Sequence, residues 1–329
     1  MTKGRINRRR FLGAAMATGI SAGLAGLAGC HPASPPMLRF GVHPWPGYEF
    51  IFLAREQGLL PEPAVRLVEM PAASDSLLAL IAGTLDGAAL TLDEVLSARA
   101  AGVELHVCTV VDISLGGDVL IARPGIDTLS ALRGRRIGVE YTGTGAIMLD
   151  DALMAAGLTP GDIEKIYVTA DRHVDAFTRH EVDAVITYEP AATRLRAAGG
   201  RVLFDSSARP GHIIDVFAFC KRALDINPAA VRALLAAHFG GRMEYLRDPQ
   251  KVAPQLARRL FLSAPELQAA FGAMTLPDAT DNQRWLAAGG DLESRAANLL
   301  RVMRQARLLE NDTPLHGLAD ARFLPVHDT

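Results

Sequence analysis

The sequence predicts an α/β fold, and three observations support this prediction. Short runs rich in Val, Ile and Leu recur from about residue 37 to residue 219, separated by Ala-rich stretches with helical features. Beyond Pro228 these runs stop, and helical stretches follow one another. Strands that alternate with helices are typical of parallel-rich sheets covered by helices on both faces. A chain of 329 residues also favours two such units over one.

Each expected strand is a short apolar run that a turn or helix signal follows. The runs cover residues 37–42, 65–69, 88–91, 105–111, 119–122, 136–140, 165–168, 183–187 and 213–219. Helix caps are expected at Ser74-Asp75 before 76–82, at Thr91 before 92–101, and at Gly157 after 146–156.

The first 29 residues resemble an export signal. Five basic side chains lie within residues 1–10, and residues 11–29 are uncharged and consist mostly of small residues. The run N-R-R-R-F-L-G at 7–13 resembles the bacterial twin-arginine signal, and L-A-G-C at 27–30 resembles the lipobox, whose cysteine is acylated. We therefore expect a signal peptide over 1–29, a lipid on Cys30 and a Pro-containing tether over 30–36. An uncleaved transmembrane helix is the alternative.

The composition of the remaining chain narrows the classes of function. Removal of residues 1–29 takes away five basic and no acidic side chains, so the formal net charge changes from −2 to −7. An acidic domain is a poor partner for nucleic acid, and we expect no such partner. The His residues lack metal-ligand spacing and no C-x-x-C occurs, so we expect no metal and no cofactor. Cys108 and Cys220 are expected to be buried free thiols, with a disulfide as the alternative.

Polar and aromatic side chains gather where the expected strands end. Ligands of open α/β sheets bind beyond the carboxyl ends of the strands, in the loops that lead into helices. His43 and Asp112 lie at two of these strand ends. The candidate ligand-binding residues are Trp45, Tyr48, Glu49, Ser74, Thr91, Asp93, Ser114, Asp118, Tyr141, Thr142, Gly143, Thr144, Tyr188, Glu189 and Asp215.

Two groups of these candidates have distinct chemistry. Trp45 and Tyr48 could form the wall of a site for a flat or apolar ligand; alternatively, Trp45 only packs its loop against its own unit. The stretch T-G-T-G at 142–145 follows a strand and opens a helix, so its backbone N–H groups could hold an anionic group. The alternative is a glycine turn that only reverses the chain.

Acidic side chains dominate the expected strand and hinge ends, where almost no Arg or Lys occurs. An anionic ligand in a closed cleft needs a cation or several donors, because an unpaired buried charge is costly. A solute with an amine, an amidine-like group or an amino-heterocycle therefore fits this inventory better than a simple oxyanion. Alternatively, most of these acids cap helices or lie on a solvated rim. The acids concerned are Glu49, Asp93, Asp112, Asp118, Glu189 and Asp215.

A series of short motifs, in order along the chain, resembles one protein family. L-R-F-G-V at 38–42 is followed by W-P-G-Y at 45–48 and F-L-A-R-E-Q-G-L at 52–59. L-R-G-R-R-I-G-V then occurs at 132–139, and V-D-A and Y-E-P occur at 182–184 and 188–190. Together they resemble periplasmic substrate-binding proteins of ABC transporters, of the nitrate, sulfonate, taurine and thiamine-precursor (NMT1/THI5-like) family.

The resemblance implies a two-lobed periplasmic-binding-protein-like fold of type II. Its parallel-rich mixed sheets would be flanked by helices and joined by a two-segment hinge, with the ligand between the lobes. Lobe 1 would comprise residues 37–115 plus 215–329, and lobe 2 residues 116–214.

The resemblance also implies a function. We expect a monomeric lipoprotein, periplasmic and anchored to a bacterial membrane through its lipid only. It would capture a small organic solute and deliver it to an ABC permease and its ATPase. No nucleophile–base pair is evident, so we expect no enzyme activity and no catalytic residues. The alternatives are an enzyme of the same fold, of the pyrimidine-precursor or menaquinone-pathway type, and a ligand sensor for a membrane receptor.

Overall fold

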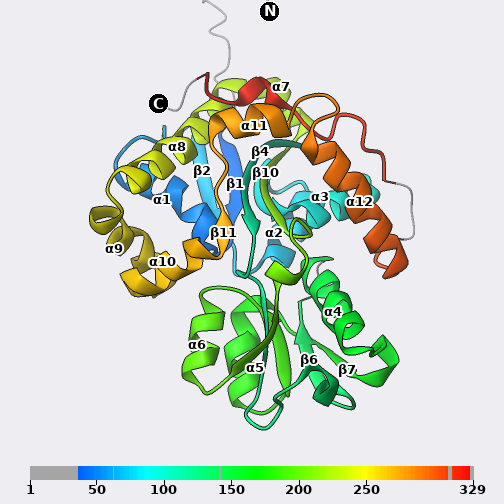
Figure 1. Cartoon of the computed structure of the whole chain (residues 1–329). Helices are drawn as coiled ribbons and strands as arrows, with labels where there is room; N and C mark the ends of the chain where they lie inside the picture. The colour runs from blue at the N-terminus through cyan, green and yellow to red at the C-terminus, as the bar shows by residue number, and fades with distance from the viewer. Residues whose placement is uncertain (1–35, 62, 141–142, 310–312, 327–329) are drawn as a thin grey trace, which may run out of the picture. The chain divides into compact units, whose positions relative to one another are not determined.

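The computed structural model describes residues 36–61, 63–140, 143–309 and 313–326, and their strands form two mixed sheets (Figure 1). In the first sheet the strand order is β11-β4-β10-β3-β1-β2. β1 pairs in parallel with β2 and β3, whereas β10 runs antiparallel to β3 and β4. Its strands are β1 (Leu38–Val42), β2 (Val65–Glu69), β3 (Gly87–Thr91), β4 (Leu105–Ser114), β10 (Ile214–Cys220) and β11 (Met274–Thr275).

Helices cover both faces of the first sheet, and together with it they form lobe 1. One face carries α1 (Glu49–Glu56), α7 (Lys221–Ile226), α8 (Pro228–Arg247), α9 (Pro249–Leu260) and α10 (Ala264–Gly272). The other carries α2 (Ala73–Ile81), α3 (Leu92–Ala100), α11 (Ala279–Trp285) and α12 (Asp291–Gln305). Figure 1 shows α1, α8, α9 and α10 on one side of these strands and α3 and α12 on the other.

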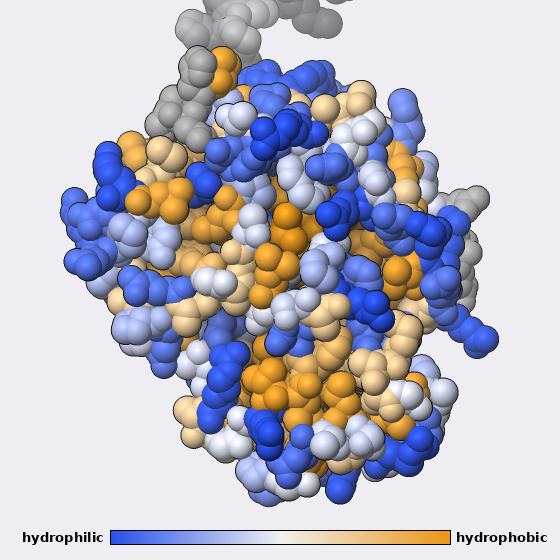
Figure 2. Space-filling model, in the orientation of Figure 1, coloured by the Kyte–Doolittle hydropathy of each residue, from blue (hydrophilic) through white to orange (hydrophobic). Residues whose placement is uncertain are grey.

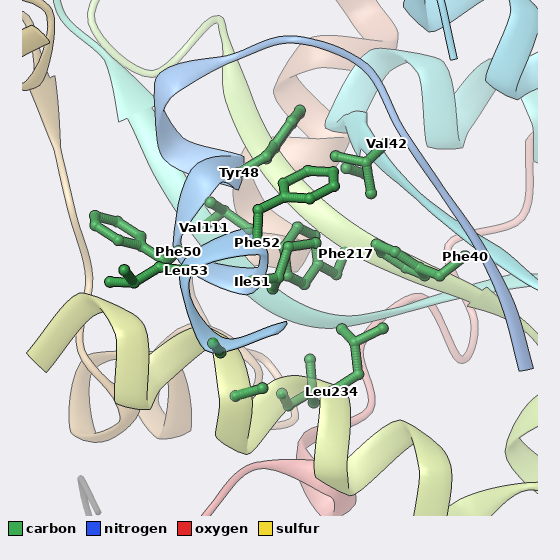
Figure 3. Packing of buried hydrophobic residues seen from close by; sticks show 14 of the residues in the cluster. Phe40, Val42, Tyr48, Phe50, Ile51, Phe52, Leu53, Val111, Phe217 and Leu234 are labelled. Carbon is green, nitrogen blue, oxygen red and sulfur yellow. The ribbon is translucent and has the colours of Figure 1, made fainter. Parts of the chain in front are cut away.

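Alternate residues of a buried strand pack into the cores on the two faces of the first sheet. In β10, Phe217 and Phe219 pack into the core on the α1 and α8 side, whereas Val216 and Ala218 pack into the core on the α3 and α12 side. Successive side chains of a strand point to opposite faces, so a strand buried on both sides is apolar throughout. Figure 3 shows the first of these cores, where Phe217 lies near Phe40. Their ring centroids are 5.0 Å apart in an edge-to-face arrangement.

The second sheet and its helices form lobe 2. The strand order is β7-β6-β8-β5-β9; β6 is parallel to β7 and β8, and β5 is antiparallel to β8 and β9. α4 (Gly143–Ala156) packs on one face, and α5 (His173–Thr178) and α6 (Ala191–Ala197) pack on the other. The strands are β5 (Val119–Ala122), β6 (Arg136–Val139), β7 (Glu164–Tyr167), β8 (Ala184–Thr187) and β9 (Arg201–Asp205). Single 3₁₀ turns are η2 (Pro46–Tyr48), η3 (Leu129–Leu132), η4 (Pro160–Asp162), η5 (Ala170–Arg172), η6 (Ser206–Ala208) and η7 (Ala321–Phe323).

Two segments connect the sheets. The chain passes from β4 to β5 through residues 115–118 and returns from β9 to β10 through residues 206–213. The segments are hydrogen-bonded to each other: Ser206 Oγ lies 2.7 Å from Ser114 Oγ and accepts from Gly116 N–H at 2.7 Å. Gly116 has φ 117°, a conformation that favours glycine.

The α/β class with mixed, helix-covered sheets is confirmed, and several element details differ from the sequence prediction. β11 lies beyond Pro228, so the expectation that strands end there is wrong. Ser74 lies inside α2, whose N-cap position is Ala72, so the expected Ser74 cap is also wrong. Thr91 is the N-cap of α3 and forms a capping box with Glu94, whose Oε2 accepts from the Thr91 N–H at 2.9 Å. β9 was not expected at all.

Other expectations hold at single residues. Cys108 and Cys220 are free thiols as expected; Cys108 is buried, whereas Cys220 is only partly buried. Gly157 follows α4 with φ 65°, as a helix-ending glycine does. The expected signal segment and Cys30 lie outside the described residues.

The surface in view is largely hydrophilic. Figure 2 shows blue side chains over most of it, and hydrophobic side chains gather where Figure 1 draws the strands of the second sheet. Among the helices that the structure describes, none has both the length and the apolar character needed to cross a bilayer.

Candidate functional site

A small cavity of about 30 Å³ lies where the two lobes meet. A water molecule needs roughly 10–15 Å³ measured in the same way, so the cavity has room for about two or three waters. A solute of several heavy atoms therefore requires the lobes to separate first. The lining residues are His43, Trp45, Ala73, Thr91, Glu94, Asp118, Glu140, Thr144, Gly145, His173, Ile186, Tyr188, Ile213 and Asp215.

Most of the polar lining residues lie at strand ends, as the sequence predicts. Thr91 ends β3, Glu140 directly follows β6, and Tyr188 directly follows β8. Asp215 lies near the start of β10, which is antiparallel to β3, so it reaches the same edge of the first sheet. The cavity is thus formed where the strand ends of both sheets come together.

Trp45 forms part of the cavity wall and is held from behind. Its indole Nε1 donates to Asp112 Oδ2 at 2.8 Å, and its ring meets Tyr188 of lobe 2 edge-to-face with centroids 5.8 Å apart. Gly47 permits this arrangement, because a Cβ atom there would lie 2.0 Å from Asp112 Oδ2. Trp45 therefore packs against its own lobe and also faces the cavity.

Asp215 is held by Tyr48, which lies behind the cavity wall. The Tyr48 hydroxyl donates to Asp215 Oδ1 through a short hydrogen bond, and Tyr48 itself is fully buried. Burial and the neighbouring Asp112 and Asp118 hold the pKa of Asp215 well above its usual range. Tyr48, a candidate ligand-binding residue, does not itself line the cavity but bonds Asp215, which does.

Asp118 presents an unsatisfied oxygen in this region. Its Oδ2 is buried and has no hydrogen-bond partner among the described residues. Burial raises the pKa of Asp118 to about 7, and the hydrogen bond to Ser114 only partly offsets that effect. An unpartnered carboxylate oxygen in a cavity is a position where a ligand donor would be favourable.

Direct hydrogen bonds join the lobes around the cavity. Thr91 Oγ1 of lobe 1 lies 2.9 Å from Thr144 Oγ1 of lobe 2. Thr144 Oγ1 also lies 3.0 Å from Asp93 Oδ1, to which it can donate. Gly143 allows this approach, because a Cβ atom there would lie 2.2 Å from Asp93 Oδ2.

A second inter-lobe contact involves a carboxylate. Ser74 donates to Glu140 Oε1 from its hydroxyl at 2.7 Å and from its backbone N–H at 3.1 Å. Burial raises the pKa of Glu140, and the Ser74 bonds oppose this rise. These contacts describe a closed cleft, in which groups of both lobes already satisfy one another.

The electrostatic character of the cleft is acidic. No Arg or Lys lines the cavity in the part of the chain that the structure describes, whereas four carboxyl groups do. Burial raises the pKa of Asp93 to about 6 and that of Asp112 to about 7. Burial also lowers the pKa of His43 and of His173 to about 4, so both rings are neutral near pH 7. The carboxyl groups that line the cavity are Glu94, Asp118, Glu140 and Asp215.

Some candidates predicted from the sequence do not line the cavity. Glu49 is fully buried and pairs with Arg259, at 2.9 Å. Glu189 pairs with Arg196 at 2.7 Å and accepts from the N–H of Thr193, in the first turn of α6. Ser114 and Asp93 support neighbouring groups. Tyr141 and Thr142 lie outside the described residues.

Several lining residues were not among the sequence candidates. Glu140 ends the expected strand 136–140 and could have been included by the same strand-end rule. Glu94 stands three residues after Thr91, in the T-x-x-E pattern that indicates a capping box. His173 has no sequence signal: it reaches the cavity from α5, and its ring bonds Thr187 Oγ1 and Val168 O. Within the described residues, no cluster of three His, Cys, Asp or Glu could hold a metal ion.

Comparisons with known proteins give consistent results. The sequence model of the family described as "NMT1/THI5 like" matches residues 45–252. The chain is 30% identical over 182 residues to a putative aliphatic sulfonates-binding protein of Escherichia coli, covering 53% of this chain and 56% of that one. It is 26% identical over 136 residues to the taurine-binding periplasmic protein of the same organism, covering 40% and 42%. The chain thus spans about half the length of the curated relatives it matches.

A solved structure agrees in fold. The alkanesulfonate-binding protein SsuA from Xanthomonas axonopodis pv. citri, bound to MOPS, superposes with a TM-score of 0.69. The alignment covers 85% of this chain and 96% of that one, at 20% sequence identity. At this identity the match concerns the fold alone.

Proposed function

This chain belongs to the NMT1/THI5-like family, and from that premise we propose that it is the substrate-binding component of an ABC importer. The observation that supports this most directly is the acidic, aromatic-walled cavity between two lobes joined by two chain segments. A solute would enter the open form and favour the closed form through contacts with both lobes. A membrane permease, with its ATPase, would then recognise the closed form. The printed names of the two E. coli relatives, which bind sulfonates and taurine, support this role.

In this proposal, each sheet with its helices moves as one unit. Lobe 1 would comprise residues 37–115 plus 215–329, and lobe 2 residues 116–214. The hydrogen bonds of Ser74 with Glu140 and of Thr91 with Thr144 would break on opening. They would form again around the bound solute.

For the solute, we propose a small organic molecule with an amine or a heterocyclic amino group. Asp118 and Asp215 face the cavity, and Asp118 Oδ2 lacks a donor within the described residues. A protonated amine would supply both the missing donor and the compensating charge. A simple alkanesulfonate would instead place a negative charge beside four carboxyl groups, with no Arg or Lys among the described lining residues. Taurine carries an ammonium group as well as a sulfonate, so it remains compatible with this site.

The cellular location of the protein is part of the same proposal. The motifs at 7–13 and 27–30 support export by the twin-arginine route and a lipid on Cys30. An anchored, monomeric binding protein would remain near its permease without touching the membrane otherwise.

Two other functions have less support. An enzyme of the same fold with a covalent mechanism needs a nucleophile aimed at the ligand. Among the described residues no Cys lines the cavity, and the thiol of Cys108 is buried, with burial raising its pKa. A ligand sensor would use the same cleft with a different membrane partner. Permease and ATPase genes beside this one would favour transport.

A thermal-shift screen with matched pairs tests the solute proposal. Taurine and ethanesulfonate differ only in the ammonium group, and ethanolamine lacks the sulfonate. A ligand at 100 times its Kd stabilises the native state by about 2.7 kcal/mol, which raises the melting temperature measurably. Amine-bearing compounds, extended to aminopyrimidines, should raise it, whereas their deaminated partners should not. A shift with ethanesulfonate or inorganic oxyanions, and none with any amine, would contradict the amine proposal.

A further inference from the structure

Asp112 and Asp215 form a carboxyl pair at the floor of the cleft. They lie directly opposite each other on the antiparallel strands β4 and β10, and both are buried. Side chains at such positions have Cβ atoms about 4.5–5.5 Å apart, and two like charges there repel each other. Asp215 lines the cavity, whereas Asp112 lies behind the wall that Trp45 forms.

The donors around this pair are all neutral. Trp45 Nε1 donates to Asp112 Oδ2, and the Tyr48 hydroxyl donates to Asp215 Oδ1. Asp112 Oδ1 is buried and has no hydrogen-bond donor among the described residues. An ionised pair would leave this oxygen unsatisfied next to a second negative charge.

Among the described residues that line the cavity, the other titratable groups do not supply a positive charge. η2 contributes Tyr48, the segment after β4 contributes Asp118, and α3 contributes Asp93 and Glu94. The groups at the ends of β1, β6 and β8 and on α5 are His43, Glu140, Tyr188 and His173. β11, the other neighbour of β4, contributes Met274 and Thr275, and neither titrates. Both histidines are neutral near pH 7, because burial lowers the pKa of each to about 4.

We propose that Asp112 and Asp215 hold one proton between them in the ligand-free closed cleft, and that a cationic group of the solute replaces this proton. With the shared proton, one carboxyl group can donate a hydrogen bond to the other, and one of the two buried negative charges is removed. When the solute's ammonium or amidinium group reaches Asp215 and Asp118, the proton leaves to bulk water. The total charge of the cleft is then unchanged. Asp112, which does not line the cavity, thereby determines charge specificity as a positioning residue. The exchange step rests on the proposed function.

The shared proton can be tested without any ligand. Infrared spectra of the full-length protein at pH 7 should contain the carbonyl band of a protonated carboxylic acid, part of which is lost in Asp112→Asn. Asp215→Asn should lose the same part, and it serves as the second variant if Asp112→Asn fails to fold. The matched control is Asp86→Asn, since Asp86 pairs with Arg39 at 2.9 Å and should be ionised. If neither cleft variant changes the band, the shared proton does not exist.

The exchange is tested by calorimetry with ethanolamine and taurine in two buffers of different ionisation enthalpy. Binding should release about one proton in the wild type and none in Asp112→Asn. Below the pKa of the pair, affinity should fall by about tenfold for each unit of pH. Binding whose heat is independent of the buffer would overturn the exchange while leaving the proposed function intact. If no amine binds in any buffer, the solute proposal fails and the exchange fails with it, whereas the infrared result still decides the shared proton.

Discussion

Ser74 of α2 and Glu140, directly after β6, are hydrogen-bonded twice across the cleft, through the hydroxyl and the backbone N–H of the serine. Both bonds reach the same carboxylate oxygen of a residue that is 4% exposed. A hydrogen bond to a charged group contributes about 1.5–3 kcal/mol. This contact therefore favours closure before any solute is present.

We expect Ser74→Ala to shift the ligand-free protein toward the open form, because Glu140 then loses its hydroxyl donor. Small-angle X-ray scattering should report a larger radius of gyration than that of the wild type. The matched control is Ser97→Ala, whose hydroxyl bonds only to Asp93 O within α3. An equal change in both variants, or none in Ser74→Ala, would show that the contact does not hold the lobes together.

Gly47→Ala should destabilise the protein by about 1–3 kcal/mol, the usual range for overpacking a buried site. The added methyl group would lie 2.0 Å from Asp112 Oδ2 and 3.0 Å from Trp45 Nε1, so the bond between them must be displaced. Urea unfolding provides the measurement. Gly272→Ala in α10 is the control, since its Cβ meets nothing within 4 Å and alanine favours helix.

Stability should fall as pH is raised from about 6.5 to about 8. Burial raises the pKa of Asp112, Asp118 and Glu49 to about 7, so the folded state binds protons that the unfolded state has already released. Each such group contributes stability that is present at low pH and is lost as pH passes its folded pKa. Over this interval each loss is about 1 kcal/mol.

The buried histidines determine the lower pH limit of this prediction. Burial lowers the pKa of His238 to about 3 and of His43 and His173 to about 4, so they oppose stability only below about pH 6.5, where the unfolded state takes up protons. Chemical unfolding at several pH values measures the slope. Asp112→Asn should make it shallower. A stability that increases from pH 6.5 to 8 would mean that these carboxyl groups are ionised in the folded protein.

Arg259→Ala should cost about 1–3 kcal/mol, because the buried Glu49 loses its charged hydrogen-bond donor and then binds a proton. Arg259 also stacks over Phe52, with its guanidinium carbon 3.5 Å from the ring centroid. Arg258→Ala is the matched control at the next position, where the ion pair with Glu56 is exposed and should contribute about 0–1 kcal/mol. Equal losses in thermal or urea unfolding would refute the difference in burial as the cause.

The fold was largely predictable because several of its strands, such as β3, β5 and β8, are fully buried and almost entirely apolar. Thr91 and Gly157 mark helix ends through local chemistry that the sequence displays directly. β11 was not predicted because a segment of two residues shows no periodicity. It forms a strand because Met274 pairs with Ser114 of β4. Ser74 failed as a cap because its hydroxyl bonds Glu140 of the other lobe, a partner 66 residues away.

The sequence indicates which loops form the cleft, but not which of their residues line the cavity. Strand ends identify Trp45, Thr91, Thr144 and Asp215, since sheet topology alone brings them together. The sequence does not distinguish a residue on the wall from one behind it. Tyr48, for example, lies behind the cavity wall and bonds Asp215, which lines the cavity.

Ser206 links the two connecting segments, since its hydroxyl bonds both Ser114 and the Gly116 amide. These bonds link the two segments where the chain leaves β4 and where it leaves β9, so the segments are coupled there. In the proposed opening, this link would keep the two connecting segments together as the lobes rotate. Ser206→Ala removes both bonds and should therefore alter the opening, although Ser206 does not line the cavity.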